Sequence, residues 1–230
     1  MLRRLLISII ALLASVGGFA QSRVAADVEV KTLMDGKVTT VTKRVFCQGN
    51  GRLVTVFSPA GNVVISNLNG EMTMYSPATN EVFTSTKTDF STKNDLLYLF
   101  LSGRSSDLGL ASYGYRLASS EYEEGGYLKR TYKSDKKGKV PTVELVLKDY
   151  LPVYVAYIDA SRKVVSKTYL SGYDTGAAFV FPSRVTGIDY LKSRDSTVTR
   201  TIYSNVRTDS SDKEFNFEIP ADAVSVKSPF

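Results

Sequence analysis

The stretch from Val28 to Phe83 decides the fold, and its second half, residues 53–83, reads LVTVFSPAGNVVISNLNGEMTMYSPATNEVF. Apolar and polar residues alternate within short runs, and turn-forming dipeptides such as Asp35-Gly36 and Asn69-Gly70 separate the runs. Asp-Gly and Asn-Gly accept the positive φ angles that two-residue hairpin turns require. The stretch therefore predicts a β-meander, in which successive antiparallel strands are joined by tight turns.

Strand-like runs continue through the second half of the chain. They cover residues 115–119, 126–132, 142–147, 153–158, 163–171, 179–191, 197–205 and 215–219. The total is about eleven or more antiparallel strands, and an open flat sheet of that many strands is unusual because it tends to curl, split or close. We therefore expect a mainly β (α+β) fold, built as a strongly curved antiparallel sheet or an unclosed β-barrel.

One segment has the pattern of a helix. Thr92 or Asn94 can cap it, Asp95 lies in its first turn, residues 96–101 form a wide apolar face, and Gly103 ends it. A short helix that is apolar nearly all round must pack against another element. The sheet is the only element of matching size, so we expect one or two short helices to lie in its concave side.

Residues 1–20 have the features of a secretory signal peptide. Arg3 and Arg4 precede the apolar run 5–16, and Gly18-Phe19-Ala20 supplies small residues for cleavage. The run is short for a bilayer span of ~20 residues, which makes a membrane anchor the weaker interpretation. We expect residues 21–230 to form a single soluble domain in the periplasm, without a transmembrane segment.

The composition argues against several kinds of chemistry. The chain of 230 residues has no histidine and a single cysteine, Cys47. This removes His-dependent nucleophilic catalysis and argues against a zinc site. The acidic residues Glu121, Glu123 and Glu124 lie beside Gly125-Gly126 and fit a hairpin tip better than the paired carboxylates of a glycosidase. We therefore expect no enzyme, no metal site and no cofactor.

The charge distribution gives no sign of nucleic-acid binding. The formal net charge is +6, and the one basic cluster, residues 136–139, lies in a predicted turn and is typical of a solvated hairpin tip. Cys47 lies within a strand-like run. We expect it to be a small buried residue rather than a reactive thiol.

Apolar residues that face the hollow are the remaining candidates for function. Methionine is flexible and polarizable, and it suits an adaptable surface for varied apolar ligands. The alternative is that the same residues only form the core between helix and sheet; both interpretations hold if the helix acts as a lid. The candidates are Met72, Met74 and Phe83 on the meander, and Leu97, Phe100 and Leu101 on the helix.

Several segments resemble the LolA/LolB lipoprotein-carrier superfamily. Residues 69–82, NGEMTMYSPATNEV, are similar to a segment that recurs in that superfamily. Residues 181–184, FPSR, residues 197–201, TVTRT, and residues 215–221, FNFEIPA, resemble a pattern near the end of outer-membrane lipoprotein-sorting relatives. The resemblance extends over nearly the whole chain after residue 20.

The resemblance implies an unclosed β-barrel with helices in its concave side. Its hollow would receive the acyl chains of lipoproteins or lipids and shield them across the periplasm, without a cofactor or catalysis. The implied partners are acylated lipoproteins or lipids, and receptor proteins at the inner and outer membranes. The alternative function is a periplasmic sensor or protein-interaction module of the same fold.

The resemblance also implies a basic residue on an early strand that bonds the lid helices when the hollow is empty. Arg44 is the position that matches it, and the alternative is an exposed strand arginine. The chain departs from the family pattern in two ways. Val45 replaces the proline that usually follows the arginine, and residues 21–30 pass quickly into a strand, so the N-terminal lid helix is expected to be missing.

Overall fold

The computed structural model describes residues 23–134, 140–190 and 195–227, and these residues form one continuous 14-stranded sheet. The strands are β1 Arg23–Met34, β2 Lys37–Gln48, β3 Leu53–Ser58, β4 Val63–Ser66, β5 Glu71–Ser76, β6 Glu81–Thr86, β7 Tyr115–Glu123, β8 Tyr127–Ser134, β9 Thr142–Lys148, β10 Leu151–Ile158, β11 Val164–Tyr173, β12 Pro182–Tyr190, β13 Ser196–Thr208 and β14 Val224–Ser225. The predicted signal peptide, 1–20, and the basic turn, 136–139, lie outside the described residues. The domain boundaries therefore stay a prediction.

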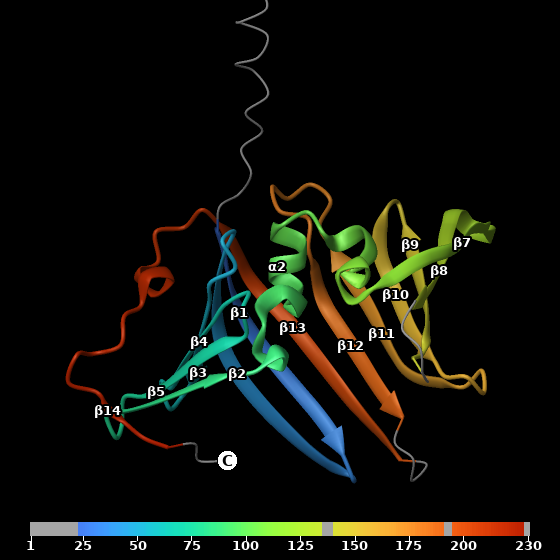
Figure 1. Ribbon diagram of the computed structural model, residues 1–230. Helices are drawn as coiled ribbons and strands as arrows, with labels where there is room; N and C mark the ends of the chain where they lie inside the picture. Colours follow the sequence, from blue (N-terminus) through green and yellow to red (C-terminus); the bar gives the residue numbers. More distant parts are fainter. Residues whose placement is uncertain (1–22, 135–139, 191–194, 228–230) are drawn as a thin grey trace, which may run out of the picture.

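The sheet is strongly curved and does not close. Its strand order is β14-β6-β5-β4-β3-β2-β1-β13-β12-β11-β10-β9-β8-β7. Neighbouring strands in the described part of the chain are antiparallel, apart from the parallel pair β14 and β6. The two strands at the ends of the order do not pair with each other among the described residues, and the sheet curls around one side (Figure 1). The predicted fold class is confirmed.

A single helical connection between β6 and β7 occupies the concave side (Figure 1). It contains the α-helix α2, Leu96–Leu101, and the short 3-10 helices η1 Thr88–Phe90, η2 Thr92–Asn94, η3 Ser105–Asp107 and η4 Leu110–Tyr113. Two further 3-10 helices are η5, Glu124–Gly126, and η6, Lys213–Asn216. Among the described residues, no helix is long and apolar enough to cross a bilayer. β1 begins at Arg23, in agreement with the expectation that residues 21–30 pass quickly into a strand.

The alternation of side chains along β1 and β2 places apolar residues on both faces of the sheet. Val24 and Cys47 belong to a buried cluster with α2 on the concave side, whereas Ala25 and Phe46 belong to a second cluster on the convex side. Successive residues of a strand point to opposite faces, so both clusters follow from the same pair of strands. Cys47 is 0% exposed and burial raises its pKa, which fits the predicted inert thiol.

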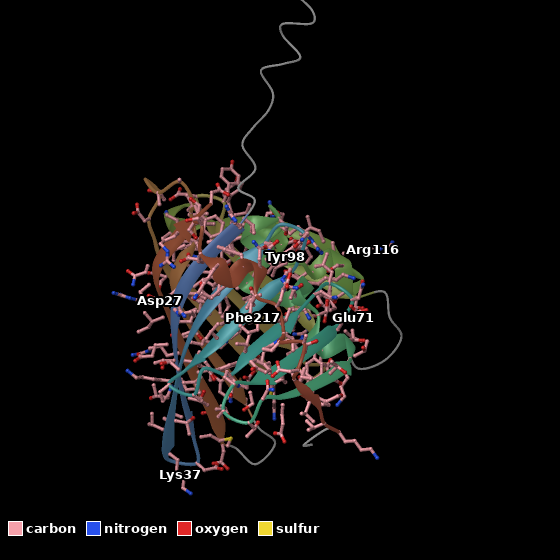
Figure 2. The ribbon with its side chains drawn as sticks, turned by 90° about the vertical axis from the view of Figure 1, so that its left-hand side faces the viewer. Asp27, Lys37, Glu71, Tyr98, Arg116 and Phe217 are labelled. Carbon is pink, nitrogen blue, oxygen red and sulfur yellow. The ribbon has the colours of Figure 1, made fainter. Side chains whose placement is uncertain are left out.

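The predicted strand 215–219 is wrong. Lys213–Asn216 forms η6, and the segment that follows crosses the convex face, where Figure 2 shows Phe217 over the strands. Gln48 Nε2 donates a hydrogen bond to the Phe215 carbonyl (2.6 Å), and Arg52 Nη2 donates one to the Phe217 carbonyl (2.6 Å). Side chains therefore occupy the backbone acceptors that a strand partner would use. The apolar alternation of the segment correctly marked buried side chains, but it did not require pairing in the sheet.

A third cluster lies under the far end of the helical connection. Leu110 of η4 packs with Val143 and Leu145 of β9 and Val155 of β10. Alternate residues of β9 are buried, as expected for a strand covered on one face. The connection thus contacts both halves of the curved sheet, through α2 in one half and η4 in the other.

Candidate functional site

Asp95 fixes the start of α2. Its Oδ1 accepts hydrogen bonds from the backbone N–H groups of Leu97 (2.9 Å) and Tyr98 (3.3 Å). It thereby satisfies two of the donors that the first turn of a helix leaves unpaired. Thr92 and Asn94, the predicted caps, lie instead in η2. Asp95 rather than either of them is the capping residue.

The three helix candidates have different surroundings. Leu97 is 1% exposed and belongs to the cluster that α2 forms with β1 and β2. Phe100 and Leu101 are half-buried and pack against the same cluster. The ring of Phe100 meets the ring of Phe181 edge-on, with centroids 5.1 Å apart. Leu97 therefore faces the sheet, whereas Phe100 and Leu101 retain accessible surface beside the hollow.

Met72, Met74 and Phe83 lie on the concave face of β5 and β6. Met74 is directly opposite Phe83 in the register of the two strands, so both side chains point to the same side. Tyr75 and Val82, one residue away on each strand, pack into the convex cluster. All three candidates are half-buried. In the described part of the chain, none of them joins the cluster around α2, so the structure does not bring the six candidates together in one group.

A cleft of about 520 Å³ lies in the other half of the concave side, beside η4. Its volume falls within the range of about 300–1,000 Å³ that is common for small-molecule sites. Apolar and aromatic side chains make most of the wall, with a few polar groups among them. The lining residues are Asn94, Leu108, Leu110, Tyr113, Tyr115, Ser134, Val140 and Tyr157. They come from the helical connection, from β7, β8 and β10, and from the residues just before β9.

The sequence did not predict this cleft. Tyr115 and Tyr157 fell in predicted strands, but the strand pattern does not say which strands lie beside the connection 104–114. One signal could have indicated it. Leu108 and Leu110 lie in a segment that otherwise resembles a surface loop, and two leucines in such a loop indicate that it packs against a core.

Arg44 lies on the convex side. Its Nη2 is 3.0 Å from Oε1 of Glu214, and its guanidinium is 5.6 Å from the centroid of the Phe46 ring. Lys43 points to the concave side, with its Nζ 5.9 Å from the centroid of the Phe57 ring. The positive charge of Lys43 also acts on Asp95 at the start of α2. This placement corrects the expectation that Arg44 bonds the helices, because a shift of one residue along a strand reverses the face.

Replacing Asp95 by alanine should lower the free energy of unfolding by about 1 kcal/mol, because alanine cannot accept the two capping hydrogen bonds. The Asp95→Asn variant keeps a side-chain oxygen and should retain most of the stability. Urea denaturation of the wild type and both variants measures the difference. Equal losses in the two variants would argue that the cap does not stabilise α2.

The raised pKa of Asp95 makes the contribution of this residue to the free energy of unfolding depend on pH. Burial raises the pKa of its carboxyl above the ordinary 3.8, while the capping hydrogen bonds and Lys43 oppose the rise. The folded state therefore binds this proton more tightly than the unfolded chain, and the resulting stability is present below pH 3.8 and lost as the pH rises through the folded pKa. The free energy of unfolding of the wild type minus that of Asp95→Asn should fall over this interval. A difference independent of pH would contradict the assignment.

Three solved structures share this architecture. A LolA superfamily protein from Nitrosomonas europaea matches with a TM-score of 0.57 and 14% identity, over 86% of this chain and 91% of that chain. A structure described as an outer membrane lipoprotein-sorting protein domain, from Vibrio parahaemolyticus, matches with a TM-score of 0.57 and 15% identity, over 85% of this chain and 90% of that chain. The chain has a LolA-like fold.

A DUF1329 family protein from Desulfovibrio piger shares the LolA-like fold, with a TM-score of 0.56 and 17% identity, over 89% of this chain and 93% of that chain. No protein-family profile matches the sequence, and no curated protein matches it. The resemblance inferred from short motifs is thus confirmed for the fold. At these identities the likeness extends to the fold alone, and the binding chemistry must be argued from the site.

The described residues bring together no group of three or more acidic or cysteine side chains that could hold a metal ion. The residues that line the cleft on the concave side offer mainly apolar and aromatic contacts, with a few polar groups among them. Tyr203 illustrates this environment, because burial raises the pKa of its phenol well above the usual range. Its ring meets that of Phe181 edge-on, with centroids 4.9 Å apart.

Proposed function

We propose that the protein is a periplasmic carrier or binder of lipids or acylated lipoproteins, which holds acyl chains on the concave side of its sheet. The observation that carries this proposal is the cleft of about 520 Å³ beside η4, with its mostly apolar and aromatic wall. The LolA-like fold supports it, since two of the solved structures that share the fold are described as a LolA superfamily protein and a lipoprotein-sorting domain.

Burial of an acyl chain can supply the free energy of binding without specific polar contacts. Each buried methylene contributes about 0.8 kcal/mol, so a chain of about 14 methylenes gains about 11 kcal/mol. Association costs at least about 4 kcal/mol in lost freedom. At most ~7 kcal/mol then remains, which corresponds to a dissociation constant of roughly 10 μM at the tightest for one chain. A second acyl chain would tighten binding further, and no catalytic step or cofactor is needed.

The sequence-derived candidates extend the proposed site beyond the cleft. Met72, Met74 and Phe83 offer half-buried apolar surface on the opposite wall of the hollow, and Phe100 and Leu101 offer it on the flank of α2. Leu97 is covered by the sheet and can touch a ligand only after α2 lifts away from β1 and β2. Such a movement would enlarge the hollow, and the positive charge of Lys43, which acts on the half-buried Asp95, would favour the closed position.

A binding experiment separates this proposal from the alternative. The protein, isolated from the periplasm, should carry acyl species detectable by mass spectrometry. It should also bind a fluorescent apolar probe that a triacylated lipopeptide displaces and the same peptide without acyl chains does not. If neither acyl species nor probe binding is found, while a protein partner is captured stably, the chain is a sensor or interaction module instead. If acyl binding is found instead, receptor proteins at the inner and outer membranes are the next partners to test, for loading and unloading.

A further inference from the structure

A second cleft, of about 620 Å³, adjoins the cleft that we assign to acyl chains. Tyr113 of η4 lines both clefts. Lys93 lines the second cleft, and its neighbour Asn94 lines the first. The complete lining of the second cleft is Leu68, Asn69, Thr88, Ser91, Lys93, Arg104, Ser112 and Tyr113. The two clefts therefore meet along the helical connection between β6 and β7.

The second cleft has a different chemical character from the first. Hydroxyl and amide groups make most of its wall, two of its lining side chains are cationic, and none of the described residues that line it is acidic. Lys93 is exposed and Arg104 is half-buried. Neither forms an ion pair with a carboxylate in the described part of the chain.

Asp89, between the lining residues Thr88 and Ser91, is exposed and does not line the cleft, and two other carboxylates close to it in sequence have partners elsewhere. Asp107 accepts hydrogen bonds from the backbone N–H groups of Gly109 (2.9 Å) and Ala111 (3.1 Å), and Asp95 caps α2. The charge of Arg104 acts on the phenol of Tyr113 and opposes the rise in pKa that burial causes there. Arg104 and Tyr113 thus line the same cleft, and the charge of Arg104 acts on the residue that the two clefts share.

We propose that this cationic cleft is a headgroup site, and that the preferred ligand is an amphiphile with an anionic phosphate or carboxylate headgroup. The inference rests on the proposed function, because the acyl chain of the same ligand would fill the first cleft. Arg104 supplies guanidinium donors suited to phosphate or carboxylate oxygens, and Lys93 supplies a second positive charge. The phenol of Tyr113 can donate a further hydrogen bond to the anion, whereas the hydroxyls of Ser91 and Ser112 already donate to the carbonyls of Leu68 and Gly109.

Affinities for single-chain palmitoyl amphiphiles test this site. The probes are lysophosphatidylglycerol and palmitate as anions, lysophosphatidylcholine as a zwitterion, and monopalmitoylglycerol as a neutral ligand. Wild-type protein should bind the anions about tenfold more tightly than the neutral ligand, the size expected for one charge-assisted hydrogen bond. A phosphate-specific site favours lysophosphatidylglycerol over palmitate, whereas a general anion site binds both. Millimolar inorganic phosphate should weaken binding of the anionic ligands only.

Charge-removing variants locate the preference. Arg104→Gln and Lys93→Gln should each lose most of the anion preference and keep the affinity for monopalmitoylglycerol, and Arg104→Lys should retain much of the preference. Lys37→Gln is the matched control, because Figure 2 shows Lys37 at the tip of the β1–β2 hairpin. The cluster under α2 lies at the other end of these two strands, around Val24 and Cys47.

The outcomes separate this inference from the proposed function. Equal affinity for anionic and neutral ligands in the wild type, or an anion preference that survives in both Gln variants, overturns the headgroup site while acyl binding stands. If none of the palmitoyl ligands binds, both proposals fall. Retained preference in Lys37→Gln together with lost preference in Arg104→Gln supports the site as drawn.

Discussion

Replacing Phe215 with alanine should lower the free energy of unfolding by about 3–5 kcal/mol, the usual cost of truncating a fully buried phenylalanine. Phe215 is 0% exposed although it lies in a segment outside the sheet. Its ring meets that of Phe46 edge-on, with centroids 5.5 Å apart, and its carbonyl accepts hydrogen bonds from Gln48 and Arg52. Truncation therefore leaves a cavity, because the hydrogen bonds to the Phe215 carbonyl hold the backbone of this segment in position.

The size of this loss matters because domains are typically stable by only about 5–15 kcal/mol. Urea denaturation of the wild type and Phe215→Ala gives the difference directly. Val224→Ala is the control in the same C-terminal segment, since Val224 is exposed and its truncation should change stability by less than about 0.5 kcal/mol. A loss below about 1 kcal/mol for Phe215→Ala would show that the C-terminal segment is not part of the core.

Replacing Leu108 with aspartate should weaken acyl binding by about 100-fold without unfolding the protein. Leu108 lines the cleft beside η4 and adopts a left-handed backbone conformation, with φ of 48°. Asp and Asn accept this conformation better than leucine does, so the backbone favours the substitution. The ligand loses contact with a leucine, worth about 1.5–3 kcal/mol, and meets a carboxylate that is costly to bury.

Two controls separate the possible causes of this loss. Leu108→Asn introduces polarity without charge and should weaken binding less than Leu108→Asp. Leu117→Asp places the same charge on β7, where Leu117 is 53% exposed and does not line the cleft, and it should bind like the wild type. Titration with a fluorescent acyl probe measures all three variants. Wild-type affinity in a folded Leu108→Asp variant would remove this cleft from the binding site.

The strands were predictable because their signals are local. Asp35 and Gly36 both have positive φ, 50° and 73°, as their hairpin turn predicted. Strand alternation likewise placed Met72 and Met74 together on one face. The apolar helix was predicted from a cap at Thr92 or Asn94 to an end at Gly103, but α2 has only six residues, Leu96–Leu101. The hydroxyl of Thr92 donates a hydrogen bond to the carbonyl of Gly51 (2.7 Å), a tertiary contact that sequence periodicity cannot reveal.

The parts that could not be predicted depend on which distant segments meet. Deciding whether Arg44 or Lys43 points toward the helices required knowing which face of β2 is concave. That follows from the pairing of β2 with β1 and β3 rather than from its own sequence. Predicting the cleft beside η4 required knowing that β10 lies under the connection that precedes β7. The C-terminal segment carries the apolar alternation of a strand, yet its carbonyls accept hydrogen bonds from the side chains of Gln48, at the end of β2, and Arg52, just before β3.

A pair of tryptophan reporters tests most directly whether acyl chains lie on the concave side. The chain contains no tryptophan, so a single introduced indole reports one position. Tyr157→Trp places it in the cleft. Tyr169→Trp places it on the convex face, where Tyr169 is 43% exposed and lies opposite Tyr154, the neighbour of the inward-facing Val155.

The measurement is quenching of each reporter by a lipid that carries bromine along its acyl chain, added below the concentration at which it aggregates. If acyl chains lie in the hollow, the Tyr157→Trp reporter should show saturable quenching and the Tyr169→Trp reporter should show none. Equal quenching of both, or quenching of the convex reporter alone, would contradict acyl binding in the hollow of the sheet.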